Sequence, residues 1–544
     1  MMFRTCAAAA VGCCLAITVL APMTAPAVAA PAAQAVPAVS GVKAAGRGLS
    51  ALSARKPPMG MLAAIQRDLG LNANQAQSRL LNESRLSPIA TQLHERLGDR
   101  FAGSWLQGPI GQTLVVATTS RADAAQITAA GAEPLIVARS LAKLQAVKDK
   151  LTAARPALSA VSSTRYIDLK TNKVVISSST PKATANSIKA ADVAPAAVRV
   201  ALSAERPRLL QASVPVIPQG YPPSVPPTDL VGGQAYYAGT ATRCSVGFAV
   251  TKGTQKGFVS AGHCGAPGTA TVGFNRLTQG SVRASTFPGD GDHSWVALND
   301  AWTPRPEVGN DSGGIMHVYG SKEAIEGSSV CLAGSSLAGL DWHCGTITQR
   351  EADVTYPEGV VEDVMRTSAC AHLGNAGAAM LSIGQAQGIV SGGSSDCENG
   401  GVTYVQPIND ILTAYGLTLV TFTKNEASTG SCNGYPNSTT GALKSGQTIY
   451  QPAGLSYRTS VTGTHYGCLE ANISGDFDLY LQKQNGLTWS TVAISQTPSP
   501  FEELGYLGPP GVYRYLLISF KGAGPYLLGY TTPQPPSDLR VRGH

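Results

Sequence analysis

Hydrophobic periodicity divides the first half of the chain into an α/β region. Apolar residues recur at three- and four-residue spacings, with Asn72 or Asn74 placed to cap the second helix, and the predicted helices are 61–70, 72–86, 89–98, 122–131 and 140–151. Apolar runs of strand length occur at 113–119 and 135–139, and residues 165–178 alternate as a β-hairpin. Together with the Ala-rich stretch that follows, these elements define a predicted α/β region at 59–210.

The second half of the chain shows short β-type segments separated by Gly, Pro and Asn turns. They fill residues 230–421, where the stretch INDILTAYGLTLV at 408–420 predicts a closing helix, and they return at 440–532. The Pro-rich stretch 211–229 is predicted to be an extended, exposed linker. The remaining segments have low complexity or look disordered, and they are the spacer 30–58, the linker 422–439 and the tail 533–544. The predicted fold class is therefore mainly β.

The N-terminus reads as a secretory signal peptide at residues 1–29. Arg4 precedes an apolar run at 5–21, and Ala27-Val28-Ala29 is a small-x-small cleavage site. The apolar run is short and is followed by prolines, which argues against a membrane-spanning helix, and no other run is long enough to span a bilayer. We therefore expect a secreted protein without a membrane span.

Cysteine usage agrees with export. Three of the eleven cysteines lie in the signal region, and none of the other eight lies before residue 244. An even number confined to the second half of an exported chain predicts four disulfides. No Cys or His spacing suits zinc, so no metal or cofactor is predicted. Asp476 and Asp478 would share one face of a strand and can bind Ca²⁺ as a pair, although solvated or capping acids are more common.

The net charge of +7 hides an uneven distribution. Residues 1–229 hold 24 Lys and Arg against 11 Asp and Glu, whereas residues 230–544 hold 17 against 23. A basic region often binds nucleic acid, but the acidic second half of the same molecule is a simpler partner. We predict that the basic region binds its own C-terminal half and that nucleic acid is not a ligand.

One hairpin carries the strongest chemical signal. In RCSVGFAVTKGTQKGFVSAGHCG at 243–265, two predicted strands lead into His263, and the adjacent Cys264 fixes the loop through a disulfide to Cys244. A general base needs an imidazole held in one place in this way. His263 is therefore a candidate catalytic base, although a lone His is more often structural.

Several motifs in sequence order resemble the α-lytic protease and streptogrisin group of bacterial chymotrypsin-fold serine proteases. They are the His263 hairpin, FPGDGDHSWVAL at 287–298, CGTITQREADVTYPEGVVEDV at 344–364, GQAQGIVSGG at 384–393 and YGLTLVT near 421. The resemblance implies a chymotrypsin-like double β-barrel at 230–421, with Asp292 as the catalytic aspartate and Ser391 supporting it. Residues 59–177 resemble the folding pro-region of the group. Residues 440–530 resemble a bacterial pre-peptidase C-terminal domain, a small β-sandwich.

The resemblance also locates the nucleophile loop, and the serine is missing from it. Where the group has Gly-Asp-Ser-Gly-Gly, this chain has Gly374-Asn375-Ala376-Gly377-Ala378. Alanine has no atom that attacks a carbonyl, although the amides of Gly374 and Ala376 can still form an oxyanion hole. The prediction is an S1-type protease homologue that is catalytically inactive and acts as a binding module, with a polypeptide ligand in the old cleft.

The alternative is an active secreted serine endopeptidase that uses Ser312, which lies in the string Asp-Ser-Gly-Gly. Ser312 comes only 20 residues after Asp292, in a stretch that the group uses to connect its two barrels, and its neighbours are ordinary turn residues. Ser382 lies six residues after Ala376 and would require the strand to be rebuilt.

Two further expectations concern the assembled chain. We expect the disulfides Cys244–Cys264, Cys331–Cys344, Cys370–Cys397 and Cys432–Cys468, because each pair is local in sequence and lies inside one predicted domain. A chain without a nucleophile cannot cut itself, so its own pro-region is expected to remain attached as a partner unless another secreted protease cuts the exposed segment 213–229. A retained pro-region is expected to cover the old cleft.

Overall fold

The structure is a computed structural model that describes residues 59–154, 162–214, 228–309, 315–337, 339–395, 397, 401–422, 432 and 435–533, with gaps at 453–455, 472–475 and 496–500. The predicted signal peptide, the spacer 30–58 and Ser312 lie outside the described residues. No helix in the described part of the chain is long and apolar enough to cross a membrane.

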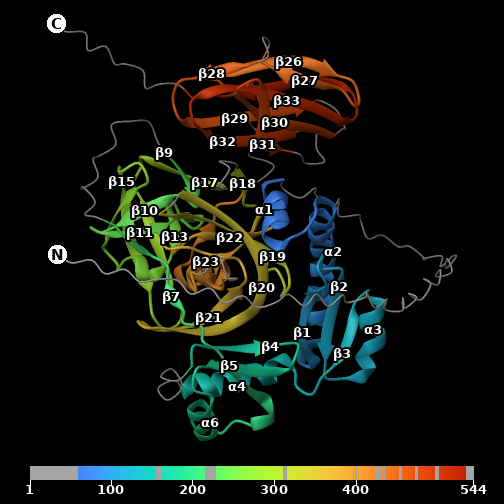
Figure 1. Ribbon diagram of the computed structural model, residues 1–544, viewed down its shortest axis with the longest axis vertical. Helices are drawn as coiled ribbons and strands as arrows, with labels where there is room; N and C mark the ends of the chain where they lie inside the picture. Colours follow the sequence, from blue (N-terminus) through green and yellow to red (C-terminus); the bar gives the residue numbers. More distant parts are fainter. Residues whose placement is uncertain are drawn as a thin grey trace, which may run out of the picture. The chain divides into compact units, whose positions relative to one another are not determined.

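The α/β region contains the elements that the periodicity predicts (Figure 1), and two predicted helices are joined into one. Helix α2 runs through Pro88, and its buried stripe of leucines continues on both sides of the proline. Asn72 caps it, since its Oδ1 accepts from the Gln75 amide at 2.9 Å and the Gln75 side chain accepts from the Asn72 amide. The helices are α1 (Met59–Leu69), α2 (Ala73–Leu97), α3 (Ala124–Ala129), α4 (Leu141–Ala153) and α6 (Pro181–Ala190).

The strands of this region form two groups. β1 (Phe101–Gln107), β2 (Thr113–Thr118) and β3 (Glu133–Ile136) form one sheet, and β4 (Thr164–Asp168), β5 (Lys173–Ser178) and β6 (Val198–Leu202) belong to another. The predicted hairpin at 165–178 is the β4–β5 pair. Sequence analysis assigned no element to the Ala-rich residues after 178, where the chain forms α6 and β6. Alanine leaves no periodic apolar signal, and β6 is held by parallel pairing with β5.

Two large β-sheets and one small three-stranded sheet make up residues 228–421. The first has nine strands in the order β25-β12-β13-β16-β15-β14-β10-β11-β8, and the second is closed because β19 pairs with both β22 and β20. Their strands are β10 (Ala235–Ala238), β11 (Thr242–Ser245), β12 (Ala249–Lys252), β13 (Gln255–Ser260), β14 (Ala270–Gly273), β15 (Thr278–Thr286), β16 (His293–Leu298), β19 (Ser329–Ser336), β20 (Gly339–Tyr356), β21 (Gly359–Thr367), β22 (Ala379–Ser382), β23 (Gln385–Gly393), β24 (Thr403–Pro407) and β25 (Thr418–Leu419).

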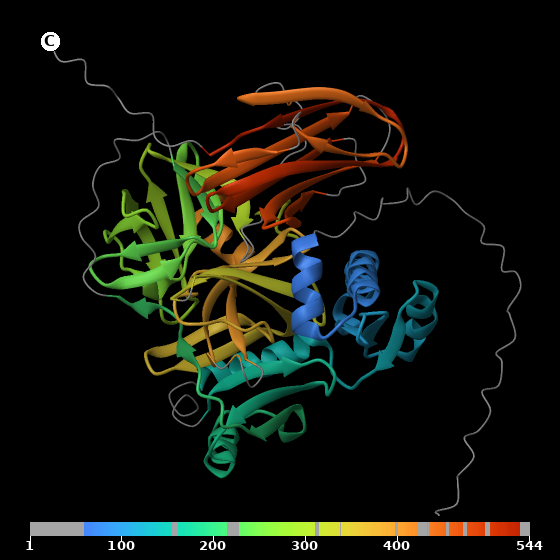
Figure 2. The same ribbon diagram turned by 45° about the horizontal axis from the view of Figure 1, so that its top comes forward.

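The α/β region extends the second of these sheets. Thr164 and Arg165 of β4 pair antiparallel with Val354 and Asp353 of β20, so that β4, β5 and β6 continue the sheet beyond its edge. Helix α1 packs beside β19 and β20 (Figure 2), where Met61 and Ile65 are buried in the same hydrophobic cluster as Trp342. The predicted closing helix is α7 (Ile408–Tyr415), which ends at Gly416 in the left-handed conformation.

The predicted exposed linker 211–229 is partly wrong. Ala212 and Ser213 form β8, which pairs with Arg243 and Thr242 of β11, and Ala212 is only 3% exposed. The main-chain hydrogen bonds of the neighbouring strand override the linker composition here. Downstream, β9 (Thr228–Gly232) pairs with β17 (Trp302–Gly309), which in turn pairs with β18 (Ile315–His317).

The last region is built from two sheets with a common core. One has the order β26-β34-β29-β32 and the other β27-β33-β30-β31, with β28 added to β33. Alternate residues such as Phe477, Leu479 and Leu481 are buried and fill the space between the sheets. The strands are β26 (Asn437–Leu443), β27 (Thr448–Gln451), β28 (Tyr457–Thr459), β29 (Gly463–Ala471), β30 (Asp476–Asn485), β31 (Thr488–Ser495), β32 (Phe501–Gly508), β33 (Gly511–Lys521) and β34 (Gly524–Tyr530).

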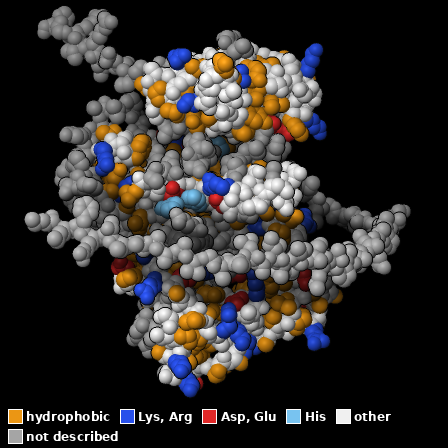
Figure 3. Space-filling model, in the orientation of Figure 1, with side chains coloured by type: hydrophobic (Ala, Val, Ile, Leu, Met, Phe, Trp, Pro, Cys, Tyr) orange, Lys and Arg blue, Asp and Glu red, His pale blue; other side chains and the backbone are white. Residues whose placement is uncertain are grey.

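Basic side chains of the α/β region are not gathered into one patch on the face drawn in Figure 3. Around β4, β5, α4 and α6 they are dispersed among hydrophobic and polar groups. Others are buried against the acidic half of the chain, and the ion pairs of Lys148 and Arg165 with Asp353 are examples. This arrangement agrees with the predicted internal partner.

Candidate active site

The loop after β13 places His263 as the sequence motif predicts. The residue lies in the short 3₁₀ turn Gly262–Cys264, and the disulfide Cys244–Cys264 ties that turn to β11. A side chain at Gly262 would collide with the carbonyl of Thr286, so glycine lets the turn lie against β15. The turn therefore fixes the main chain on both sides of the imidazole.

Asp292 holds the imidazole in one orientation. Its Oδ2 lies 2.7 Å from His263 Nδ1, and its Oδ1 accepts the backbone N–H of His263 at 3.0 Å. Ser391 donates to the same Oδ2 at 2.6 Å, as the resemblance implies for this serine. Complete burial alone would raise the pKa of Asp292, but His263 and these hydrogen bonds hold the pKa below its ordinary value. The carboxylate therefore stays ionised and orients the ring.

Two further residues support this arrangement and were missed by sequence analysis. The hydroxyl of Tyr356 lies 3.1 Å from Ser391 Oγ, and Gln406 Oε1 accepts the backbone N–H of Asp292 at 2.9 Å. Both residues come from strands of the second sheet, 64 and 114 residues after Asp292. No local motif marks them, because their partners are reached only through the pairing of β20, β21, β23 and β24.

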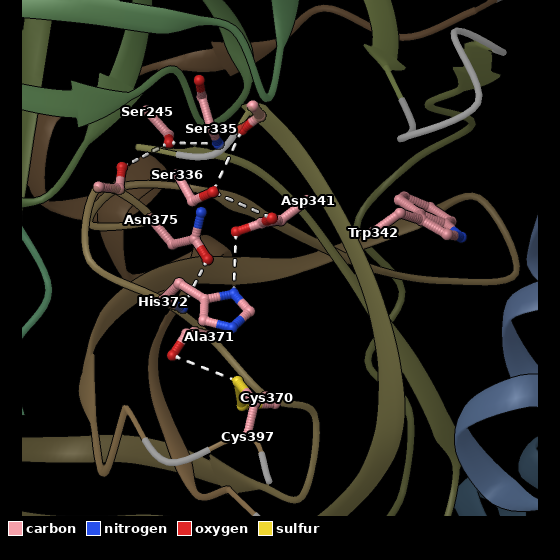
Figure 4. A network of polar contacts seen from close by, with 12 residues as sticks. Ser245, Ser335, Ser336, Asp341, Trp342, Cys370, Ala371, His372, Asn375 and Cys397 are labelled. Atoms are coloured by element: carbon pink, nitrogen blue, oxygen red, sulfur yellow. Dashed lines mark hydrogen bonds and ion pairs between the residues drawn. A yellow bond between two sulfur atoms is a disulfide. The ribbon is translucent and has the colours of Figure 1, made fainter.

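The loop 374–378 keeps two amides aimed at one point. The backbone N–H groups of Gly374 and Ala376 both donate to the carbonyl of Leu210, at 2.6 and 3.3 Å. Asn375 Oδ1 accepts the His372 amide at 2.8 Å, and Ser245 Oγ donates to the Gly374 carbonyl at 2.9 Å. Figure 4 shows Asn375 between these groups, with the disulfide Cys370–Cys397 below the loop. The loop thus presents the donor pair that an oxyanion hole needs.

The second ring nitrogen of His263, Nε2, finds no hydrogen-bonding side chain in the loop 374–378. Nε2 of His263 is buried and has no hydrogen-bond partner among the described residues. Ala376 is completely buried and ends at its Cβ. A buried polar atom without a partner is rare in a folded protein.

Residues 208–213 lie against the loop 374–378. β7 (Arg208–Leu209) pairs antiparallel with Gly393 and Gly392 of β23, and β8 (Ala212–Ser213) pairs with β11. The Leu210 side chain is completely buried in the cluster that contains Ala371, Ala376 and Val390. Residues 208–209 therefore pair with β23, the Leu210 carbonyl accepts from the amides of Gly374 and Ala376, and residues 212–213 pair with β11.

The alternative serines are placed as follows. Ser312 lies outside the described residues. The two strands that flank it in sequence, β17 and β18, pair with each other, and Gly309 of β17 lies opposite Ile315 of β18. Ser382 is buried at the end of β22 and pairs with Gln385.

The structure joins the eight cysteines into the four expected disulfides, Cys244–Cys264, Cys331–Cys344, Cys370–Cys397 and Cys432–Cys468. Asp476 and Asp478 lie on β30 and take part in no group of three metal-ligating side chains among the described residues.

Comparison with known proteins identifies the family. The model of the alpha-lytic protease pro N-terminal family matches residues 74–137, and that of the alpha-lytic protease prodomain matches residues 139–195. Streptogrisin-C of Streptomyces griseus is 44% identical over 418 residues, which cover 76% of this chain and 85% of that protein. The chain belongs to the streptogrisin family of bacterial chymotrypsin-fold serine proteases.

Other relatives fall in the same group. Serine protease 1 of Rarobacter faecitabidus is 32% identical over 382 residues, which cover 69% of this chain and 66% of that protein. The solved structure of Thermobifida fusca protease A is 46% identical and aligns with 36% of this chain and 100% of its own, with a TM-score of 0.33. The streptogrisin-type fold is mainly β and carries an α/β pro-region in the same chain, as predicted.

Proposed function

We propose that this streptogrisin-type chain is a secreted, catalytically inactive homologue whose cleft holds a peptide without cutting it. The observation that carries the proposal is the Leu210 carbonyl, which accepts from Gly374 and Ala376 in a site where no described side chain replaces the missing serine. His263 and Asp292 then form a vestigial dyad. The binding geometry is kept and the attacking atom is absent.

The chemistry of acyl transfer explains why the loss is decisive. The dyad can take a proton, but only a hydroxyl or thiol positioned beside Nε2 can form the acyl-enzyme. Without the nucleophile, the oxyanion hole and substrate binding leave a residual advantage of about 10³–10⁴-fold over water. Uncatalysed peptide hydrolysis in water is so slow that this remaining rate enhancement does not amount to proteolysis.

The contacts on the segment 208–213 support a binding role. Backbone pairing on both sides of Leu210 is the mode in which a strand edge captures an extended peptide. The segment lies in the site as a substrate would. Because the Leu210 carbonyl accepts from the two loop amides, the scissile bond of that substrate is Leu210–Gln211. The first peptide held by this cleft is then the chain's own pro-region, which remains attached because nothing in the molecule cuts it.

The domain plan that goes with this proposal has a pro-region at 59–210, the protease-like domain at 230–421 and a pre-peptidase C-terminal-like domain at 440–532. The tightly packed sandwich of the last domain supports an accessory or binding role. The signal-like residues 1–29 support export.

Restoring the serine tests the proposal. The full chain is produced in a host without extracellular proteases as wild type, as Ala376→Ser and as Ala376→Ser with Asn375→Asp and Ala378→Gly. We expect the wild type to stay uncut and unlabelled by a fluorophosphonate, and a serine variant to cut itself at Leu210–Gln211. Adding His263→Ala to that variant is the matched control and should abolish the cut.

Two results would contradict the proposal. One is a wild-type chain that cuts itself or is labelled, with the activity lost on Ser312→Ala, which would establish the endopeptidase alternative. The other is a folded triple variant that remains inert, because the missing serine would then not be the reason for inactivity.

A further inference from the structure

A group of three metal-ligating side chains lies beside the loop 374–378 and outside the dyad. Asp341, His343 and His372 each offer one ligand atom, and these atoms all lie within 4.8 Å of one another. It is the only group of three or more such residues among the described parts of the chain. Asp341 and His343 are two residues apart on β20 and therefore point to the same side of the sheet. His372 reaches them from the segment after Cys370.

The geometry of two of the three donors already matches a metal site. His372 Nδ1 lies 3.2 Å from Asp341 Oδ2, and Figure 4 shows the imidazole facing that carboxylate. Two ligands of a tetrahedral zinc ion lie about 3.3 Å apart when each bond is about 2.0–2.1 Å. Ser336 donates to the other carboxylate oxygen, Asp341 Oδ1, at 3.1 Å. An outer hydrogen bond of this kind orients a ligating carboxylate.

His343 supplies the third donor of the group. Its ring lies edge-on to that of His372, with centroids 5.4 Å apart, and neither ring nitrogen has a hydrogen-bond partner among the described residues. A simple His–Asp pair accounts for His372 and Asp341 but leaves His343 unexplained.

We propose that Asp341, His343 and His372 form a binding site for a divalent transition metal, with Zn²⁺ as the best match. Two imidazoles and one carboxylate are a donor set that zinc accepts, and the side chain of His372 is 40% exposed, which leaves room for water in the fourth position. The three donor atoms lie within 4.8 Å of one another, so the side chains must move closer together to reach the tetrahedral spacing of about 3.3 Å. This proposal does not depend on the loss of catalysis.

The site would connect two parts of the cleft wall. β19 and β20 supply Ser336, Asp341 and His343, while His372 donates its backbone N–H to Asn375 in the loop that holds the Leu210 carbonyl. A bound metal would therefore fix the spacing between the β19–β20 hairpin and that loop. Sequence analysis predicted no metal because the ligands lie 29 and 31 residues apart along the chain, without any recognisable spacing.

Calorimetric titration of the full chain with Zn²⁺ tests the proposal. The protein is untagged and stripped with a chelator, and we expect one site per chain and a rise of the unfolding temperature with Zn²⁺. Loss of an outer-shell partner alone costs about 10–100-fold in metal affinity, so His343→Ala, His372→Ala and Asp341→Asn should each weaken binding at least about tenfold. His94→Ala, which removes an exposed histidine of α2, is the matched control and should bind Zn²⁺ as the wild type does.

The outcomes separate clearly. Wild type that does not bind Zn²⁺, or variants that are folded by circular dichroism and bind it with unchanged affinity, would overturn the proposal. Ca²⁺ bound as tightly as Zn²⁺ would also overturn it, because Ca²⁺ selects oxygen ligands. If one variant fails to fold, the tetrahedral absorption of Co²⁺ in the wild type and its loss in the other two variants decide the question.

Discussion

The buried carboxylate of Asp353 helps to hold the pro-region on the protease-like domain. Asp353 of β20 accepts from Arg165 Nε and Nη2 at 3.0 and 2.7 Å and from Thr152 Oγ1 at 2.9 Å. Lys148 Nζ lies 3.0 Å from its other oxygen. The side chains of Asp353, Lys148 and Arg165 are only 3%, 3% and 5% exposed. These three side chains come from the pro-region, whereas the Asp363 N–H of β21 donates to Asp353 Oδ1 at 3.4 Å. Asp353→Asn therefore removes a charge from the interface without removing its volume.

The expected loss follows from the contacts that remain. Breaking a buried ion pair by removing one partner costs about 3–5 kcal/mol, because an uncompensated charge is left behind. Lys148 keeps a second carboxylate, Asp363, but the other contact described for Arg165 is the carbonyl of Leu151 at 3.3 Å. We therefore expect about 3 kcal/mol, the lower end of that range. This equals roughly a hundredfold loss in the equilibrium that docks β4 on β20.

Hydrogen exchange of the β4 amides in the full chain, together with urea unfolding, measures this loss. Asp363→Asn is the matched control, because the Asp363 side chain is 58% exposed and, among the residues that the structure describes, binds only Lys148. It should cost less than about 1 kcal/mol. The partners also hold the pKa of Asp353 below its ordinary value, against the effect of burial. The stabilisation is therefore present above the unfolded pKa of about 3.9 and is lost on acidification below it, in the wild type only. Equal losses in the two variants would refute the reasoning.

Two further predictions address the pro-region contacts. In Gly392→Ala the new Cβ lies 2.5 Å from the Arg208 carbonyl and 2.5 Å from the Tyr356 hydroxyl. The segment 208–213 should therefore loosen, and trypsin should cut after Arg208 faster than in the wild type; an unchanged rate would show that β7 does not lie on β23 in solution. Burial raises the pKa of Glu83 to about 7, against the pull of Arg79 and Ser329, so its stabilising contribution is complete below about pH 4.5 and is lost as the pH rises to 7. Glu83→Gln should remove that part of the pH dependence, as measured by urea midpoints across this range; the same slope in the variant would assign the titration to another group.

The sequence predicted the parts of the site that local motifs encode. Cys264, next to His263, and its disulfide partner Cys244 flank one hairpin, and Asp292 immediately precedes β16, so a short stretch of chain contains each motif. Ser391 follows from the strand motif that contains it. These residues meet because β13, β16 and β23 have fixed places in the sheets, and the resemblance to the protease group identified them in the sequence.

The cleft segment and the candidate metal site could not be read in this way. Residues 208–213 are held mainly through backbone hydrogen bonds, which leave no side-chain pattern, and they lie next to Pro-rich sequence that favours a linker. Asp341 and His343 belong to the β19–β20 hairpin, and His372 belongs to the segment after Cys370. The three side chains lie close together only because the fold brings that hairpin and that segment side by side. Both features depend on tertiary placement, and no window along the chain contains the information.

If residues 208–213 stay uncut, as the proposed function requires, they compete with any other ligand of this site. The segment is tied on one side to the pro-region and on the other, through residues 215–227, to the protease-like domain. Ligands tethered by short linkers act at an effective concentration of about the millimolar range, so a free peptide must exceed that level or bind far more tightly to compete. Buried pairing at Asp353 opposes release of the pro-region as a whole. A binding role toward outside peptides therefore requires that another protease first removes the segment, and the state of the pro-region, more than the affinity of the cleft, then decides when the protein binds.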